Sequence, residues 1–469
     1  MISRTTYRLT MTAATLALAG CAIGPDYVRP ATPLPASYAD ATASEQATVN
    51  ARWWTLFGDA TLDQLVDKAL QNNADLRLAI ARVEQADAVA REAGASFFPE
   101  ITGIAGGSNT QASTKTAIYN SALPRIRNSR SASLSTSYEL DLWGRVRRAN
   151  EAAKATQLAT TYARDSVRLS VAGLVTSTYL GLRAVDVQLQ MTAATLKSRE
   201  ESLKLVNTRI DAGLSAPVDG LQAATALSAA QAQQADLTRQ RALAEHQLAL
   251  LTGDPSLKVA AGDLRPLPLP PQPPAGLPAD LVAARPDIRQ AEQELVAANA
   301  GIGIAKAGYF PRLSLTASLG SESKALSDLF SAGSGTWALG LGALMPILDF
   351  GRTSARVDQA KAVNQQSLIA WQNALAVAYK EVRDALVSLR EDATADSAQQ
   401  SRVDNAARVL AIVEKRYAAG HAGYLEVLDA QRSHNEAAIA AISARQARLI
   451  ASVDLFKALG GGWQSEAAR

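Results

Sequence analysis

Few side chains in this sequence are placed to do nucleophilic, acid–base or metal chemistry. The 469 residues include three histidines and one cysteine. His246, His421 and His434 stand in Ala- or Gln-rich helical context or at a turn, where we expect ordinary solvated side chains. One cysteine permits neither an intrachain disulfide nor a Cys₄ or Cys₂His₂ zinc site. Residues 349–351 (Asp-Phe-Gly) imitate a kinase motif without the other kinase elements. We therefore predict no enzyme activity, no cofactor and no metal site.

The cysteine has the clearest chemistry of all these residues. The first eight residues carry two positive charges, and a mostly apolar stretch follows from Leu9 to Ala19, too short to span a bilayer. This order is typical of a secretory signal peptide. Residues 18–21 read Leu-Ala-Gly-Cys and resemble a bacterial lipobox, in which the cysteine becomes the mature N-terminus and receives acyl chains. We predict lipidation at Cys21 and anchoring in lipid. The residue after the cysteine, Ala22, is compatible with export of the lipoprotein to the outer membrane.

The composition favours long helices over a large compact core. Hydrophobic residues make up 48% of the chain, much of it Ala, and aromatic residues only 5%. Lys and Arg number 47 against 44 Asp and Glu, which gives a formal charge of +3. This balance argues against nucleic acid as a partner.

The sequence contains two copies of one unit, because the same landmarks recur in the same order at an offset of about 207 to 212 residues. The paired landmarks are Asp75-Leu76-Arg77 with Asp287-Ile288-Arg289, Phe98-Pro99 with Phe310-Pro311, residues 141–145 (Asp-Leu-Trp-Gly-Arg) with 349–352 (Asp-Phe-Gly-Arg), and residues 209–213 with 416–420.

Each copy is expected to contain the same elements in the same order. The first helix ends at Phe-Pro, because proline disfavours helix at the preceding residue. Two β-like segments, a long proline-free helix, a Gly-centred break and a last helix follow. The ranges in copy one and copy two are 62–97 and 283–309 for the first helix, 100–142 and 313–348 for the β-hairpin, 145–211 and 352–419 for the long helix, and 217–251 and 422–459 for the last helix.

Prolines divide the rest of the chain. Four prolines between residues 23 and 50 forbid a long helix, and eight prolines mark an extended linker between the copies. The predicted segments are a signal peptide (1–20), a lipid-anchored extended segment (21–60), repeat 1 (61–252), the Pro-rich linker (253–279), repeat 2 (280–460) and a C-terminal tail (461–469).

The two long helices keep an apolar period of seven. In copy one the period runs from Val175 to Ile210, and in copy two from Leu368 to Tyr417 with one miss at Asp396. A sustained seven-residue repeat gives a left-handed supercoil. A helix of about 67 residues is roughly 100 Å long, which suits a rod that crosses the periplasm. An ordinary coiled-coil stalk would show the same pattern.

The β-like segments favour a channel over a stalk. Residues 131–140, 313–319 and 337–343 alternate apolar with polar or small side chains, whereas 100–110 alternates poorly because of its glycines. One apolar and one polar face over about ten residues is typical of a transmembrane barrel strand, although a soluble hairpin shows it too. Four strands cannot close a barrel, and lipid does not tolerate an open edge. Several chains must therefore share one barrel.

Further motifs resemble those of OprM/NodT-type outer-membrane efflux lipoproteins, over nearly the whole mature chain. They are residues 24–30 (Gly-Pro-Asp-Tyr-Val-Arg-Pro), Trp53-Trp54, Phe57-Gly58-Asp59, residues 276–281 (Gly-Leu-Pro-Ala-Asp-Leu), residues 285–289 (Arg-Pro-Asp-Ile-Arg), Ala305-Lys306-Ala307 and Phe310-Pro311. The resemblance implies a mixed α and β membrane protein with the TolC-like fold: a trimer with a shared 12-stranded outer-membrane β-barrel and a long periplasmic α-helical coiled-coil barrel.

The function implied by the resemblance is the exit duct of a tripartite efflux pump, lipid-anchored in the outer membrane and extending into the periplasm. The implied partners are two further copies of the chain, a periplasmic adaptor (membrane fusion) protein, an inner-membrane pump of the resistance-nodulation-division (RND) class and outer-membrane lipid. The alternative is a lipid-anchored periplasmic coiled-coil adaptor or structural protein without a pore. A secreted lipoprotein enzyme would need a concave polar site.

The resemblance also implies a gate at the periplasmic end. Its gate residues would be Leu425 and Asp429, with Arg416 and Tyr417 as tethers. Three Asp429 carboxylates near one axis would select cations and repel one another. The simpler interpretation makes Asp429 a solvated residue and Arg416 a charge that complements its helix dipole.

Two glycine turns would form the tips of the helical tube. Gly213 and Gly420 suit C-terminal helix caps, because glycine adopts the left-handed conformation there at little cost. We predict adaptor contacts at these turns. The alternative is two helix-joining turns without a partner.

Overall fold

The computed structural model describes residues 22–31, 34–35, 38, 51–117, 119–271 and 285–462. The predicted signal peptide and the predicted lipidation site, Cys21, lie outside the described residues, as does motif 276–281. The chain forms two compact units, and each takes segments from both sequence copies. Of the described residues, the first unit contains 22–30 and those within Val83–Ala159 and Ala291–Trp371, and the second contains the others. The two copies therefore interleave instead of folding separately.

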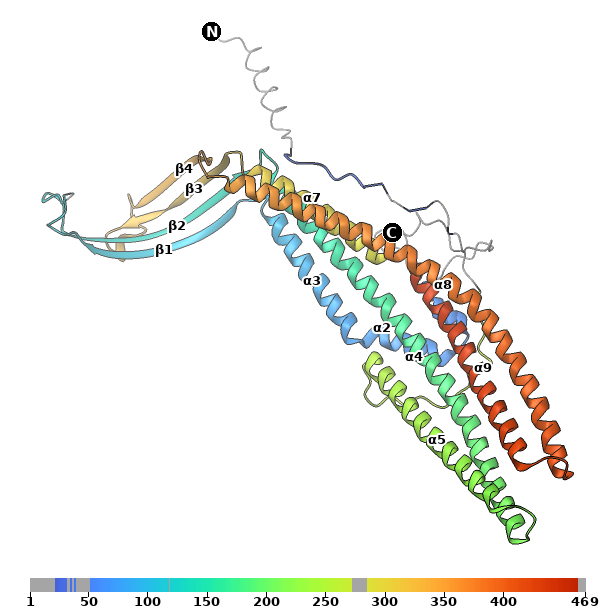
Figure 1. Ribbon diagram of the computed structural model, residues 1–469. Helices are drawn as coiled ribbons and strands as arrows, with labels where there is room; N and C mark the ends of the chain where they lie inside the picture. The colour runs from blue at the N-terminus through green and yellow to red at the C-terminus, as the bar shows by residue number, and fades with distance from the viewer. Residues whose placement is uncertain are drawn as a thin grey trace. The chain divides into compact units, whose positions relative to one another are not determined.

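The first unit contains one antiparallel sheet in the order β1-β2-β3-β4 (Figure 1). The central pair joins a strand of each copy, with Leu134 opposite Leu319 and Tyr138 opposite Leu315. Strand β1 is exposed along its whole length, and β4 nearly so. Within one chain β1 and β4 each have one unpaired edge. The strands are β1 (Glu100–Gln111), β2 (Ile126–Leu140), β3 (Arg312–Ser323) and β4 (Gly335–Leu344).

Strand β1 forms despite its poor alternation. It pairs with β2 over its full length, from Glu100 opposite Ser137 to Gln111 opposite Ile126. This register also explains why β2 begins earlier than the predicted segment 131–140. The hydrogen-bonded partner strand fixes both strands here, and side-chain alternation contributes less.

Described residues of the N-terminal segment are fastened to helices of the first unit. Asp26 accepts a hydrogen bond from Arg148 Nη2 on α4 (Arg145–Asp211) at 2.6 Å. Arg29 donates through Nε and Nη2 to Glu292 on α7 (Pro286–Ala307), at 2.6 and 2.9 Å. Burial first, and then the negative charge of Glu292, raise the pKa of Tyr27 to about 12. These contacts attach the residues that follow the predicted lipid anchor to α4 and α7.

The predicted single helix 62–97 is wrong, because it is two helices: α2 (Ala60–Asn72) and α3 (Ala74–Ala95). Asn73 separates them with an extended ψ of 131° and is almost fully buried. Its Oδ1 accepts from the backbone of Asp75 and Leu76, and its Nδ2 donates to the Leu251 carbonyl at 3.1 Å. The asparagine side chain thus ends one helix and caps the next.

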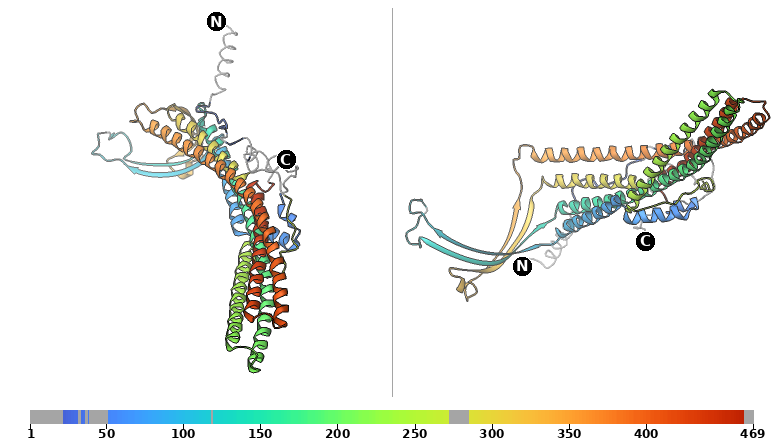
Figure 2. Two further views of the ribbon diagram at one scale, coloured as in Figure 1. Left: turned by 45° about the vertical axis from the view of Figure 1, so that its right-hand side comes forward. Right: turned by 90° about the horizontal axis from the view of Figure 1, so that it is seen from below.

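The second unit consists mainly of two helical hairpins (Figure 2). In one, α4 lies beside α5 (Pro217–Thr252), and in the other α8 (Arg352–Ala418) lies beside α9 (Tyr424–Ala458). Helix α4 has the bounds expected from the sequence, and α8 ends one residue early. Among the described helices, no 18-residue stretch is apolar enough to cross a lipid bilayer.

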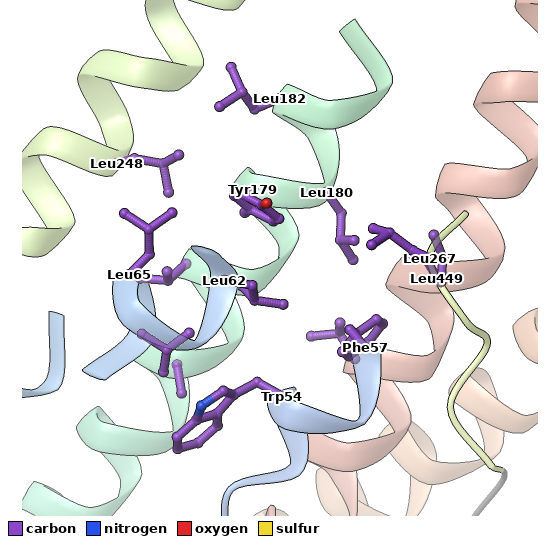
Figure 3. Close-up of a cluster of buried hydrophobic side chains, with 14 of the residues drawn as sticks. Trp54, Phe57, Leu62, Leu65, Tyr179, Leu180, Leu182, Leu248, Leu267 and Leu449 are labelled. Atoms are coloured by element: carbon purple, nitrogen blue, oxygen red, sulfur yellow. The ribbon is translucent and has the colours of Figure 1, made fainter. Parts of the chain in front are cut away.

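An apolar core holds the second unit together (Figure 3). The short helix η1 (Trp53–Phe57) inserts its aromatic side chains between α4 and α9, and Trp53 stacks on Phe456 with ring centroids 5.4 Å apart. Asp59 caps α2 and accepts a 2.5 Å hydrogen bond from the Tyr179 hydroxyl. The aromatic motif Trp53-Trp54 and Phe57 therefore forms part of the apolar core that packs against α4 and α9.

A buried charge network ties the start of the linker to α4 and α5. Asp186 accepts hydrogen bonds from Arg183 at 3.1 Å, Arg241 at 2.7 Å and the Gly262 backbone at 3.0 Å. Burial alone would raise the pKa of Glu245, but hydrogen bonds from Val259 and Lys258 and the charge of Arg241 bring it below its ordinary value. Both carboxylates are therefore fully paired.

Candidate functional site at the helix tips

The two hairpins of the second unit meet at their tips. Val206 near the end of α4, Ala223 on α5 and Tyr424 at the start of α9 form a buried cluster. Further partly buried side chains pack around it: Leu203, Ile210, Tyr417 and Leu428. The two turns that link the helices are therefore held side by side by apolar contacts.

Both turn glycines have the predicted cap conformation. Gly213 has a φ of +70° and Gly420 a φ of +79°. The amide of the following residue donates to a carbonyl five residues earlier, Leu214 to Arg209 at 2.7 Å and His421 to Arg416 at 2.8 Å. This is the Schellman pattern, which satisfies the last carbonyls of α4 and α8. A Cβ at either glycine would meet open space, so the turns are exposed.

Leu425 and Asp429 lie one helical turn apart on α9, so they share a face of that helix. Leu425 is 63% exposed. The two residues line a groove of about 410 Å³ between α4, α5 and α9. Asp429 Oδ1 accepts a hydrogen bond from Arg432 Nη2 at 2.7 Å, and both side chains are exposed. Sequence reasoning missed Arg432, although its spacing of three residues from Asp429 is that of a helical ion pair.

The predicted tethers hold their own hairpin. Arg416 Nη2 donates to the His421 carbonyl at 3.1 Å, and Nη1 lies 3.7 Å from Glu426 Oε2. The Tyr417 ring lies 6.0 Å from that of Tyr424, and the guanidinium of Arg209 lies 5.1 Å from the Tyr417 ring centroid. These contacts fix the angle at which α8 turns into α9. They also join that turn to the end of α4.

Arg199 is a second functional candidate that sequence reasoning missed. It is buried on α4, and its Nη1 donates to Gln431 Oε1 at 2.6 Å. Burial lowers its pKa below the ordinary arginine value. The signal was present in the heptads, because Arg199 lies three residues after Leu196 and so at an apolar position of the repeat. A cation at that position marks a polar contact between the hairpins.

Two acidic side chains of the site lie beside arginines, Asp429 beside Arg432 and Glu426 beside Arg416. In the described part of the chain, no group of three or more His, Cys, Asp or Glu residues is placed to hold a metal ion. Exposed carboxylates beside an apolar side chain at a helix tip can attract cations that pass the tip and repel carboxylates on neighbouring helices.

Comparison with known proteins identifies the type of molecule. The chain matches the family model described as outer membrane efflux protein twice, over residues 65–254 and 277–461, which confirms the internal duplication. The solvent efflux pump outer membrane protein SrpC of Pseudomonas putida is 38% identical over 96% of this chain and 97% of its own. The cation efflux system protein CusC of Escherichia coli is 34% identical over 96% and 97%.

Solved structures agree over the same length. The CmeC outer membrane channel of Campylobacter jejuni aligns with a TM-score of 0.89 at 26% identity, covering 95% of this chain and 96% of its own. The open-state MtrE outer membrane channel of Neisseria gonorrhoeae aligns with a TM-score of 0.86 at 31% identity, covering 94% and 98%.

Proposed function

Because this chain belongs to the outer membrane efflux protein family, we propose that three copies assemble into one channel, the exit duct of a tripartite efflux pump. The chain is an outer-membrane conduit of the TolC-like fold and not an enzyme. The observation that carries the assembly is the four-stranded sheet with unpaired edges at β1 and β4. An open edge is not stable in lipid, so β1 of one copy pairs with β4 of the next. Three copies supply about twelve strands.

The helix tips are the proposed gate. In a threefold assembly, Leu425 and Asp429 of each copy face a common axis, and the exposure of both side chains in the single chain supports this placement. Three carboxylates at the axis attract cations and repel one another, while Arg432 neutralises part of their charge. Arg416 and Tyr417 hold the α8–α9 turn that carries them.

The turns at Gly213 and Gly420 are the proposed contact with a periplasmic adaptor. Both are exposed, and Leu214 beside the first glycine is 73% exposed. The adaptor in turn connects the duct to an inner-membrane pump of the RND class.

The proposed cargo is small molecules in general, selected before they reach this chain. Relatives of similar identity are named for a solvent, an antibiotic and a cation. One duct architecture thus serves chemically unlike compounds, so its fold does not set the substrate.

Planar-bilayer recording tests this proposal. We expect the purified protein to form pores of small, cation-selective conductance, and Asp429→Ala to increase the conductance because it removes like charges from the gate. Asp404→Ala, which removes an exposed carboxylate from α8 about four turns before its C-terminal end, is the matched control and should leave the conductance unchanged. Absence of pores in wild type and variant would support the poreless coiled-coil adaptor instead.

A further inference from the structure

A pocket of about 610 Å³ lies in the first unit, where β4 passes into α8. It combines apolar and basic side chains. The apolar ones are Ile304, Phe310, Leu344, Met345 and Pro346, and the basic ones are Arg145, Arg312, Arg352 and Arg356. We call it the junction pocket. The gate and the proposed adaptor contacts belong to the second unit, so the conduit function leaves this pocket unexplained.

The charge of the junction pocket is strongly positive. Asp349 is its one lining carboxylate, and Asp349 accepts hydrogen bonds from the Gly351 and Thr353 backbone and the Thr353 hydroxyl at the start of α8. Arg145 is neutralised by Glu139 at 2.7 Å. The other three arginines are exposed and make no side-chain hydrogen bond or ion pair within the described residues: Arg312, Arg352 and Arg356.

The other copy of the repeat provides an internal comparison. Arg145 and Arg352 correspond, and each follows an aspartate that caps the long helix: Asp141 and Asp349. Two residues before that aspartate, copy one has Glu139, which binds Arg145 through two hydrogen bonds of 2.8 and 2.7 Å. Copy two has Ile347 at the same position. The exchange removes the partner of Arg352 and exposes an apolar side chain.

The turn beside the pocket exposes unusually large apolar side chains. Ile347 is 88% exposed, Leu348 74% and Phe350 91%. Phe350 also has a φ of +52°, which is unfavourable for a residue with a Cβ, so the turn holds its ring outward at some conformational cost. In copy one the corresponding Trp143 packs on Phe310 instead, with ring centroids 4.7 Å apart.

We propose that the junction pocket binds the headgroup of an anionic phospholipid in the periplasmic leaflet of the outer membrane. The proposal rests on the proposed assembly, in which the strands lie in the membrane and the helices extend into the periplasm. The β4–α8 junction is then at the height of those headgroups. Arg312, Arg352 and Arg356 contact the phosphate, because guanidinium groups bind phosphate oxygens with charge-assisted hydrogen bonds. The acyl chains lie along the exposed turn residues.

Native mass spectrometry of the detergent-purified full-length protein tests the proposal, with phosphatidylglycerol and phosphatidylcholine as the added lipids. Wild type should bind phosphatidylglycerol preferentially. Arg352→Gln with Arg356→Gln should weaken that binding about 25-fold, because each arginine near a headgroup contributes about fivefold. Ile347→Glu restores the carboxylate of copy one and should weaken binding through Arg352 without removing any arginine.

The matched control is Arg402→Gln with Arg408→Gln, which removes two exposed arginines elsewhere on α8 and should leave lipid binding unchanged. If the double arginine variant does not assemble, the Ile347→Glu variant carries the test. The proposal is overturned if wild type binds the two lipids with equal affinity, or if the control variant loses as much affinity for phosphatidylglycerol as the double arginine variant. It is also overturned if inorganic phosphate competes for the pocket as well as phosphatidylglycerol does. It is also overturned if the variants lose subunit association while lipid affinity per copy stays the same, since the pocket would then be a contact between copies.

Discussion

Single charged residues in the helical unit act through specific partners, and their removal should be measurable. Asp186 is 2% exposed in its side chain and accepts from two arginines and one backbone amide. Asp186→Ala removes the carboxylate partner of the buried Arg183, which costs about 3–5 kcal/mol of unfolding free energy. The measurement is the guanidinium midpoint of the detergent-solubilised protein.

An exposed pair provides the control for that variant. Asp236 accepts from Arg239 at 2.5 Å on the surface of α5. Exposed ion pairs contribute little, because water and salt screen them. Asp236→Ala should therefore leave the midpoint unchanged, and a loss equal to that of Asp186→Ala would contradict the role assigned to the buried network.

The ionised carboxylate of Asp254 should make the stability of the folded protein depend on pH in the acidic range. Its carboxylate accepts hydrogen bonds from Lys68, at 2.6 Å, and from Ser256, which lower its pKa from 3.8 to about 2. A lowered pKa means that the folded state is stabilised by ionised Asp254 above about pH 3.8, and that this stabilisation is lost as the pH falls towards 2. Asp254→Asn should melt below wild type at pH 5 to 7, and the two curves should converge near pH 2.

Thermal melting between pH 2 and 7 checks this, with Asp404→Asn as a variant of equal charge change. A constant gap between wild type and Asp254→Asn across the whole range would show that the carboxylate does not act through its ionisation.

At the scale of elements, the long helices could be predicted because they lack proline and keep a seven-residue period. The break at Asn73 could not, because it depends on a buried hydrogen bond to Leu251, a residue far away in the sequence. Strand β1 was the weakest prediction, because glycines interrupt its apolar–polar alternation. Its extended conformation depends on pairing with β2, which the alternation of one segment does not reveal. For the proposed gate, the family resemblance implied Leu425 and Asp429. Arg432 and Arg199 left signals in the sequence, a spacing of three residues and a heptad position, but the structure was needed to identify their partners.

The turn between α8 and α9 gives an element-scale prediction. Gly420 has a left-handed φ, so Gly420→Ala should make opening of this turn easier by about 1–2 kcal/mol. Hydrogen–deuterium exchange of residues 415–428 should then be roughly 5- to 30-fold faster. Gly423 lies in the same turn with a φ of −80° and open space around it, so Gly423→Ala should exchange like wild type. Equal exchange in both variants would argue against the cap.

At the scale of the whole molecule, the boundaries of the two sequence copies differ from the boundaries of the two compact units. The sequence divides into two copies, but each long helix passes through both compact units, so neither copy can complete a unit alone. The sheet likewise needs a hairpin from each copy. Periodicity and landmarks reveal the copies, whereas their interleaving follows from long-range pairing of β2 with β3.

In the proposed assembly, separate chains close one barrel by pairing β1 of one copy with β4 of the next. Within one chain these strands are three strand spacings apart, roughly 14 Å, which is too far for a disulfide. A cysteine on each strand can therefore cross-link only between copies. We would scan Thr102 and Ile104 on β1 against Leu339 and Leu341 on β4, keeping Cys21 for lipidation.

The measurement is a non-reducing denaturing gel of oxidised outer membranes from these double-cysteine variants, beside each single-cysteine variant. At least one pair should give bands of two and three times the mass of the monomer, none larger, and all removed by reductant. Only monomer in every pair, or a ladder that continues beyond three copies, would contradict a closed barrel shared by three chains.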